Sequence, residues 1–222
     1  NPMSLFAGLG ATSAVLMLVF KDTIEGLVAG IRLTSNEMVH VGDWITVPGT
    51  PVDGNVVDIT LTTVKVQQFD NTYTTVSPLT LVNGSFKNWK GMQDSGMRQV
   101  VKKIYFDVRS IQLLNDKTRQ NLTNKNMVAL KEMEGEVVNI GLFRHYIETY
   151  LRKRDDVNKS ATLMVRQLEA TQNGLPIELY FFLNTTEWVN YEQKTSDILE
   201  HIYAYANEFG LQVYEGFAAI NK

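Results

Sequence analysis

The feature that most constrains this chain is its opening segment, residues 1–20, which contains no charged side chain. About 20 predominantly apolar residues are enough for a helix to cross the hydrocarbon core of a bilayer. Small residues recur within this run, at Gly8, Gly10, Ala11, Ser13 and Ala14. Small side chains let membrane helices approach one another closely. The pattern therefore predicts a membrane helix that packs against copies of itself.

Two other interpretations of residues 1–20 stay open. A secretory signal would carry a basic segment before its apolar run, but no Lys or Arg precedes Phe20. A buried helix of a soluble protein would accommodate Ser4, Thr12 and Ser13, which interrupt the apolar run. The segment that follows favours the membrane interpretation over both.

A second helical pattern begins after Lys21 and Asp22, which end the charge-free stretch. Its apolar residues follow the i, i+3, i+4, i+7 spacing of one helix face and are Ile24, Leu27, Val28 and Ile31. An amphipathic helix of this kind can lie at a membrane interface or along a neighbouring subunit. Lys and Arg occur only after the predicted span, and the positive-inside tendency then places everything after Phe20 in the cytoplasm.

Composition limits what the remaining residues can do. The chain has 222 residues, of which 44% are hydrophobic and 20% charged, so two modest domains can follow the span. It contains no cysteine, which excludes disulfides and thiolate metal ligands. A formal net charge of -3 argues against electrostatic binding of nucleic acid. His40, His145 and His201 stand in separate segments without partners at metal-ligand spacing, so we expect no enzyme, no metal and no cofactor.

Between Asp43 and Trp89 the hydrophobic pattern changes to period two, which is typical of β-strands. Short alternating runs are separated by turn formers at residues 48–51, 53–54 and 70–71. Four or five short antiparallel strands are predicted. Because open sheet edges promote aggregation, we expect a small β-barrel-like domain over residues 37–92, or edges paired with a neighbour.

The last part, residues 93–222, has mixed patterns. Strands are predicted at 100–108, 161–169, 176–183 and 211–217, and helices at 139–154 and 191–209. The order β-α-β-β-α-β is that of a ferredoxin-like α/β domain. An extra polar segment at about 115–138 lengthens the first crossover and is expected to be partly helical.

The order of these parts resembles the small-conductance mechanosensitive ion channel family. The resemblance rests on the glycine- and alanine-containing apolar helix, on Leu-Val-Ala-Gly-Ile at 27–31, on Val-Gly-Asp-Trp-Ile at 41–45, and on the stretch 54–83 with Thr63, Asp70 and Pro78. It covers most of the chain and is strongest over residues 8–89. The long crossover and Phe-Lys-Asp-Thr at 20–23 are similar to the miniconductance branch.

This resemblance implies a fold and an assembly. The fold would be membrane α plus cytoplasmic β and α+β, with a kinked pore-lining transmembrane helix and its amphipathic second half in residues 1–36. The chain would form a homo-oligomer of seven copies in the bacterial inner membrane, in contact with lipids and permeating ions. Further transmembrane helices precede this part in family members, so we interpret the sequence as a fragment of a longer protein.

In a parallel ring of helices, the residues on one face of each helix all point toward the axis of the ring. Ala11, Ala14 and Leu18 then form stacked rings, and the family's constriction maps onto Ala14 and Leu18. Lys21 and Asp22 are expected to act as a polar hinge where the helix breaks. Simple helix packing for Ala14 and lipid contact for Leu18 are the alternatives that leave these residues without a role in gating.

Close helix packing is assigned to Gly8, Gly10 and Ser13. The expected function is a channel subunit that opens under membrane tension and releases ions and small osmolytes during hypoosmotic shock. The competing hypothesis is a membrane-anchored scaffold or interaction module that does not conduct.

Overall fold

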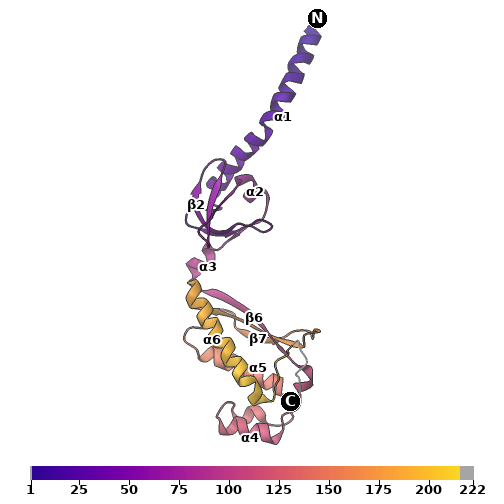
Figure 1. The fold of residues 1–222 in the computed structure, drawn as a ribbon, viewed down its shortest axis with the longest axis vertical. Coiled ribbons are helices and arrows are strands. Elements are labelled where there is room, and N and C mark those ends of the chain that lie inside the picture. Colours follow the sequence, from indigo (N-terminus) through magenta and orange to yellow (C-terminus); the bar gives the residue numbers. More distant parts are fainter. Residues whose placement is uncertain (1, 216–222) are drawn as a thin grey trace. The chain divides into compact units, whose positions relative to one another are not determined.

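The computed structural model describes residues 2–215 (Figure 1). Contacts divide the chain into two compact units, the first ending at Asp94 and the second beginning at Ser95. The first unit contains a long helix and a small sheet, and the second is a separate α/β unit. Each unit has a hydrophobic cluster of its own.

The first unit begins with α1, Pro2–Ser35, a single helix of 34 residues. Five strands follow, and the bounds are β1 Trp44–Thr46, β2 Asp53–Ile59, β3 Val64–Gln68, β4 Tyr73–Val76 and β5 Lys87–Asn88. They form one antiparallel sheet in the order β4-β3-β2-β1-β5. The predicted set of short antiparallel strands is confirmed. The expected barrel-like closure is not seen among the described strands, because β4 and the two-residue β5 remain the edges of an open sheet.

Two short helices complete this part of the chain, α2 at Pro78–Asn83 and α3 at Lys90–Ser95. Ser77 caps α2, since its hydroxyl accepts a hydrogen bond from the Leu79 amide at 3.2 Å, and Pro78 occupies the first helical turn. Our sequence interpretation had no helix here, although a serine followed by proline is a recognised start signal.

The core of the first unit lies on one face of the sheet. Val64 and Val66 of β3 are fully buried while Lys65 between them points to the other face, as the two-residue period of a strand requires. Leu81 of α2 and Leu33 of α1 join this cluster and are also fully buried. The sheet is therefore covered partly by the end of α1 itself.

The second unit has three paired strands, β6 Arg98–Phe106, β7 Met164–Gln167 and β8 Leu175–Leu183, in the order β6-β8-β7. Its two long helices are α5 at Asn139–Lys153 and α6 at Trp188–Ala206. An isolated antiparallel bridge joins Phe106 to Val213. Since β8 lies between β6 and β7 and pairs with both antiparallel, this is the predicted ferredoxin-like order. The predicted strand at 211–217 appears only as that bridge, and residues 216 and 217 lie outside the described part.

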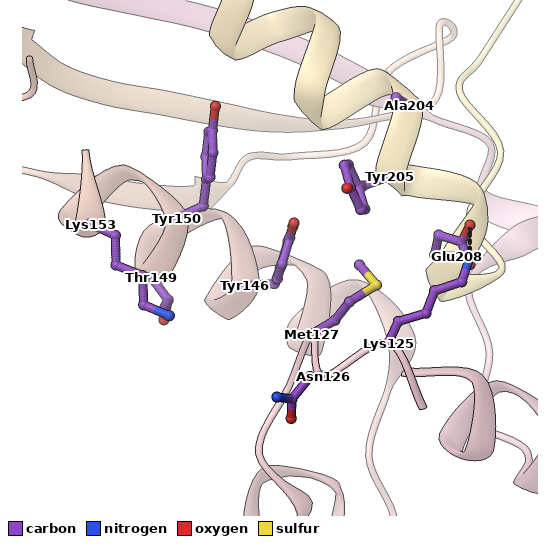
Figure 2. A pocket seen from close by; sticks show the side chains of 10 residues that line it. All are labelled: Lys125, Asn126, Met127, Tyr146, Thr149, Tyr150, Lys153, Ala204, Tyr205 and Glu208. Carbon is purple, nitrogen blue, oxygen red and sulfur yellow. Dashed lines mark hydrogen bonds and ion pairs between the residues drawn. The ribbon is translucent and has the colours of Figure 1, made fainter. Parts of the chain in front are cut away.

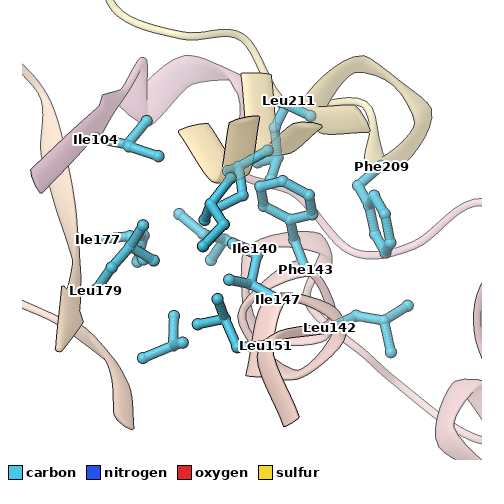
Figure 3. Packing of buried hydrophobic residues seen from close by; sticks show 14 of the residues in the cluster. Ile104, Ile140, Leu142, Phe143, Ile147, Leu151, Ile177, Leu179, Phe209 and Leu211 are labelled. Carbon is cyan, nitrogen blue, oxygen red and sulfur yellow. The ribbon is translucent and has the colours of Figure 1, made fainter. Parts of the chain in front are cut away.

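The core of this unit forms where α5 packs against the sheet (Figure 3). Ile140, Phe143, Ile147 and Leu151 follow helical spacing, and all four are buried. Opposite them, the strands contribute a buried apolar set that includes Ile104, Ile177 and Leu179. The helix predicted at 139–154 is thus confirmed, and the sheet covers its apolar stripe.

The extended crossover contains α4 at Asp116–Asn124 and the 3-10 turn η2 at Leu130–Met133, with a further turn, η1, at Val108–Ser110 before it. Its predicted partly helical character is confirmed. Leu122 and Met133 are buried and anchor the segment to the core. Asn139 is also buried, and its amide donates to the carbonyls of Ser110 at 2.9 Å and Phe209 at 3.1 Å. Phe209 belongs to η3, the turn Asn207–Phe209 that follows α6.

A two-point ion pair stabilises the loop after α5. The Arg154 guanidinium donates to Asp156 from Nε at 2.9 Å and from the terminal nitrogen Nη2 at 2.7 Å. This hydrogen bonding holds the pKa of Asp156 below its ordinary value of 3.8. A depressed carboxylate pKa adds stability above the pKa of the unfolded state, and that contribution disappears as pH falls through the folded-state pKa.

We therefore expect the free energy of unfolding of the second unit to decrease by about 1 kcal/mol on acidification below about pH 4 because of Asp156. Asp156→Asn should remove this component, measured by chemical unfolding at a series of pH values. Asp155→Asn is the matched control, since the Asp155 side chain is fully exposed and lies 3.9 Å from Lys159. Identical pH profiles for the wild type and Asp156→Asn would contradict the expectation.

Candidate functional site

The first half of α1 is apolar and uncovered. Within the described chain its large side chains remain mostly solvent-accessible, for example Phe6 at 73%, Met17 at 73% and Leu18 at 74%. Contiguous apolar surface of this extent on a folded chain marks a site that another molecule covers. Because the exposed residues lie on every side of the helix, one neighbouring helix cannot cover them all.

The predicted gate residues Ala11, Ala14 and Leu18 are exposed and fall on one face of α1. At 100° per residue their directions lie within about 60° of one another. The predicted packing positions Gly8 and Gly10 have no atom within 4 Å of where a Cβ would stand. The single chain thus places these residues on an open surface, and their roles remain predictions.

Thr12 is compatible with an apolar environment despite its hydroxyl group. Its Oγ1 donates to the backbone carbonyl of Gly8 at 2.9 Å, so the polar hydrogen is satisfied inside the helix. Within residues 2–215, however, no helix combines the length and the apolar content that a membrane crossing requires. The segment predicted to span the membrane is helical, and its crossing stays a prediction.

The predicted break at Lys21 and Asp22 is wrong, because α1 continues without interruption from Pro2 to Ser35. Neither residue prevents helical geometry, and no proline or glycine lies between Phe20 and Ile24. The Lys21 ammonium lies 3.9 Å from Glu25 one turn further on, a spacing that mildly supports a helix. A hinge role for the pair is not tested by this geometry.

The second half of α1 is attached to its own sheet. Our sequence interpretation placed the helix after residue 22 at the membrane interface or along a neighbouring subunit, on account of the stripe through Ile24 and Ile31. Those two residues are exposed, at 54% and 53%, whereas Ala29, Gly30 and Leu33 on another face are buried. One face of the helix is thus fixed to the β sheet and the predicted stripe is left uncovered.

Gly30 is the point of closest approach in this junction. A Cβ built on Gly30 would collide with the backbone carbonyl oxygen of Leu61, in the loop between β2 and β3. Only glycine allows the helix and this loop to come so near. The hydroxyl of Thr34 donates back to the Gly30 carbonyl at 2.9 Å, which satisfies a polar group on the same turn of the helix.

A groove of about 320 Å³ runs between α1 and α2. Its apolar walls come from Val28 and Ala29 on α1 and from Leu79 and Val82 on α2, and Arg32 also lines it. The groove shows where α1 contacts the sheet unit through α2 as well as through the Leu61 loop. Any tilt of the second half of α1 must therefore deform these two contacts.

A buried carboxylate fixes the path from α1 into the sheet. Asp43 is 4% exposed and accepts hydrogen bonds from the His40 amide at 2.9 Å and from Asn88 Nδ2 at 2.8 Å. Gly42 before it has a φ of 96°, a conformation that favours glycine. The Val-Gly-Asp-Trp-Ile segment is thus explained by a tight turn and a buried acceptor, which link β1, β5 and the end of α1.

In the described part of the chain, no group of three or more His, Asp or Glu side chains is placed to hold a metal ion. The three histidines occupy different settings. His40 lies beside Asp43, His145 faces Glu132 at 3.4 Å, and His201 is stacked on Tyr150. Nothing in this arrangement resembles a catalytic triad.

Parts of the chain are similar to known proteins. Residues 22–91 match the family description "Mechanosensitive ion channel, beta-domain". The chain is 22% identical over 193 residues to the low conductance mechanosensitive channel YnaI of Escherichia coli K12, covering 87% of this chain and 47% of that protein. It is 23% identical over 208 residues to an uncharacterized MscS family protein of Helicobacter pylori strain 26695, covering 90% of this chain and 32% of that protein.

Solved structures agree on the fold. A cryo-EM structure of Arabidopsis thaliana MSL1 superposes with a TM-score of 0.70 at 12% identity, covering 96% of this chain and 66% of that one. The crystal structure of Helicobacter pylori MscS in its closed state gives a TM-score of 0.64 at 12% identity, covering all of this chain and 75% of that one. Residues 22–91 are thus similar to the β-domain of mechanosensitive ion channels, and most of the chain is similar to curated proteins of the MscS family.

The chain spans less than half the length of these two curated relatives. What they do as whole proteins therefore bears on this chain only as a proposal. The miniconductance branch, predicted from residues 20–23 and the long crossover, is likewise not tested by these matches.

Proposed function

We propose that this chain is the subunit of an ion channel that opens under membrane tension and releases ions and small osmolytes during hypoosmotic shock. The observation that carries the proposal is the first half of α1, which is apolar on all sides and uncovered. Such a surface needs lipid on one side and copies of the same helix on the other. The similarity of residues 22–91 to the β-domain of mechanosensitive ion channels and of the chain to YnaI supports an ion-conducting role for that arrangement.

The proposed assembly is a ring of seven copies in the bacterial inner membrane, with the sheet and α/β units in the cytoplasm. In this ring Ala11, Ala14 and Leu18 face the axis, and Gly8, Gly10 and Ser13 face neighbouring helices. A ring of leucines narrow enough to exclude water blocks ions without a plug, because a dewetted constriction is costly for a charge to enter. Lys21 and Asp22 stand at the cytoplasmic mouth, where we retain them as a hinge that bends only during gating.

Tension can drive this opening because it favours whichever state occupies more membrane area. Opening is then a shift between two packings of the helix ring. Small residues support the change, since glycine and serine faces slide past each other without interlocking side chains. The attachment of Ala29, Gly30 and Leu33 to the sheet fixes one end of α1 while the other end moves.

Recording from membrane patches tests the proposal. The purified full-length protein is reconstituted in bilayers, and suction applied to a patch should produce discrete current steps whose frequency rises with tension. Protein-free patches provide the baseline. Absence of such steps up to patch rupture would contradict the proposal and would favour a membrane-anchored scaffold that does not conduct.

A further inference from the structure

The second unit contains a cavity of about 760 Å³ between α5, α6 and the segment that follows α4 (Figure 2). Ligand sites of proteins commonly enclose about 300–1,000 Å³. The lining residues are Lys125, Asn126, Met127, Tyr146, Thr149, Tyr150, Lys153, Ala204, Tyr205 and Glu208. They mix flat aromatic rings with two ammonium groups, and neither the predicted gate nor the junction at Gly30 uses them.

The three tyrosines that line the cavity, Tyr146, Tyr150 and Tyr205, belong to a ring cluster that also contains His201. His201 lies parallel to Tyr150 with ring centroids 3.8 Å apart, and Tyr205 lies 4.3 Å from His201. The Tyr146 ring follows at 6.0 Å from both His201 and Tyr205. The spacings of 146 with 150 and of 201 with 205 place each pair on one helix face. The rings therefore come from two helices that the fold brings together.

A hydrogen bond holds these rings in place. Tyr146 Oη lies 2.9 Å from His201 Nε2. Burial raises the pKa of Tyr146 to about 12 and lowers the pKa of His201, so both groups are neutral at neutral pH and share this hydrogen bond. The rings are consequently ordered before any ligand arrives, which reduces the entropy that binding must overcome.

Charged side chains lie at two ends of the cavity (Figure 2). Lys125 Nζ lies 2.6 Å from Glu208 Oε1, and Asn121 donates to the other oxygen of Glu208 at 2.6 Å. Lys153 is exposed at the rim beside Thr149. Two ammonium groups against one carboxylate leave the lining with a net positive charge. An ammonium group attracts phosphate oxygens as a point charge.

We propose that this cavity binds a small anion of the nucleoside phosphate class, which combines a planar base with a charged phosphate. The base stacks against the tyrosine rings that line the cavity, since every base has a face that stacks on aromatic side chains. The phosphate then lies near Lys153 and Thr149, which are neighbours on α5, because Lys125 at the other end is already paired with Glu208. The volume, the ordered ring stack and the positive rim all belong to one cavity, and each requirement of such a ligand is met there.

Isothermal titration of the full chain with AMP tests this proposal. Adenosine supplies the ring without the phosphate, ribose 5-phosphate supplies the phosphate without the ring, and 4-hydroxybenzoate is a planar carboxylate of another class. AMP should bind once per chain and at least about tenfold more tightly than either half molecule. No AMP binding, or equal binding of AMP and ribose 5-phosphate, would overturn the proposal, as would tighter binding of 4-hydroxybenzoate.

Substitutions inside and outside the cavity test whether AMP binds there. Lys153→Gln should weaken AMP binding about fivefold, whereas Lys117→Gln on the exposed first turn of α4 should leave it unchanged. Thr149→Trp should fill the cavity and remove binding while circular dichroism keeps its wild-type shape. Equal weakening by the two lysine variants would reveal general charge attraction and overturn the proposal. Binding is measured without ionic current, so this outcome is independent of whether the channel function proposed above holds.

Discussion

Replacement of Leu18 by serine is expected to lower the membrane tension at which the channel opens. In the proposed ring, every copy contributes one Leu18 side chain to the narrowest part of the pore, and the leucines keep water out of it. A hydroxyl at each position lets water enter and stabilises the open, hydrated state. The effect is large because it is repeated around the ring, and each 1 kcal/mol gained by the open state raises the ratio of open to closed channels about fivefold.

The matched control is Leu16→Ser. Leu16 is also exposed on α1, but it lies about 200° around the helix from Leu18 and so points away from the proposed pore axis. Patch recording should give a lower threshold for Leu18→Ser and a nearly unchanged one for Leu16→Ser. If Leu18→Ser opens at the wild-type tension, Leu18 has no part in the gate and only lipid contact remains for it.

Replacement of Gly30 by alanine is expected to destabilise the first unit by about 2 kcal/mol, the size typical of a core forced to accept an extra methyl group. The new Cβ would meet the backbone carbonyl oxygen of Leu61, which cannot rotate away as the end of a flexible side chain can. The helix or the loop must move, and the buried contacts of Ala29 and Leu33 would be disturbed.

Gly26→Ala is the control for this substitution, one helical turn earlier. Its Cβ would meet no atom within 4 Å, and alanine favours a helix over glycine by about 1 kcal/mol. The urea concentration at the midpoint of unfolding is followed by the fluorescence of Trp44 and Trp89 in the first unit. It should therefore fall for Gly30→Ala and rise for Gly26→Ala. If Gly30→Ala is as stable as the wild type, the contact between α1 and the Leu61 loop is not as close as described.

These two predictions concern different parts of α1. Described residues of the same chain cover the helix at Gly30 but not at Leu18. Near Leu18 nothing in the described chain covers the helix. At Gly30 the sheet unit reaches within van der Waals contact of its backbone. In the proposed channel, a movement of α1 at Leu18 is thus opposed by a fixed attachment about 12 residues away, roughly 18 Å along a helix.

Much of the fold could be predicted from local sequence patterns. The alternation around Val64 and Val66 indicated strands with one buried face, and the spacing of Ile140, Phe143 and Ile147 indicated the buried stripe of a helix. Both are borne out, because a side chain's direction from the backbone depends only on its position within the strand or helix. Residues 1–20 were likewise identified as an apolar helix without any knowledge of what surrounds it.

Other features depended on contacts between segments far apart in the sequence. The charged pair Lys21 and Asp22 suggested a break, yet the helix continues because charge alone does not interrupt a helical backbone. Gly30 looked like one more small residue of α1, and nothing near it in the sequence pointed to the Leu61 carbonyl. The ring stack around His201 was missed because its members lie on α5 and α6, some 50 residues apart.

The sequence by itself therefore determined the class of each segment: an apolar helix, a small antiparallel sheet and an α/β unit of ferredoxin-like order. Only the tertiary structure decided that the end of α1 is packed on the sheet, that Asp43 is a buried acceptor, and that Tyr146 lines a cavity and contacts His201. The physical reason is that periodicity reports which side of an element avoids water. It carries no information on which distant residues will cover that side.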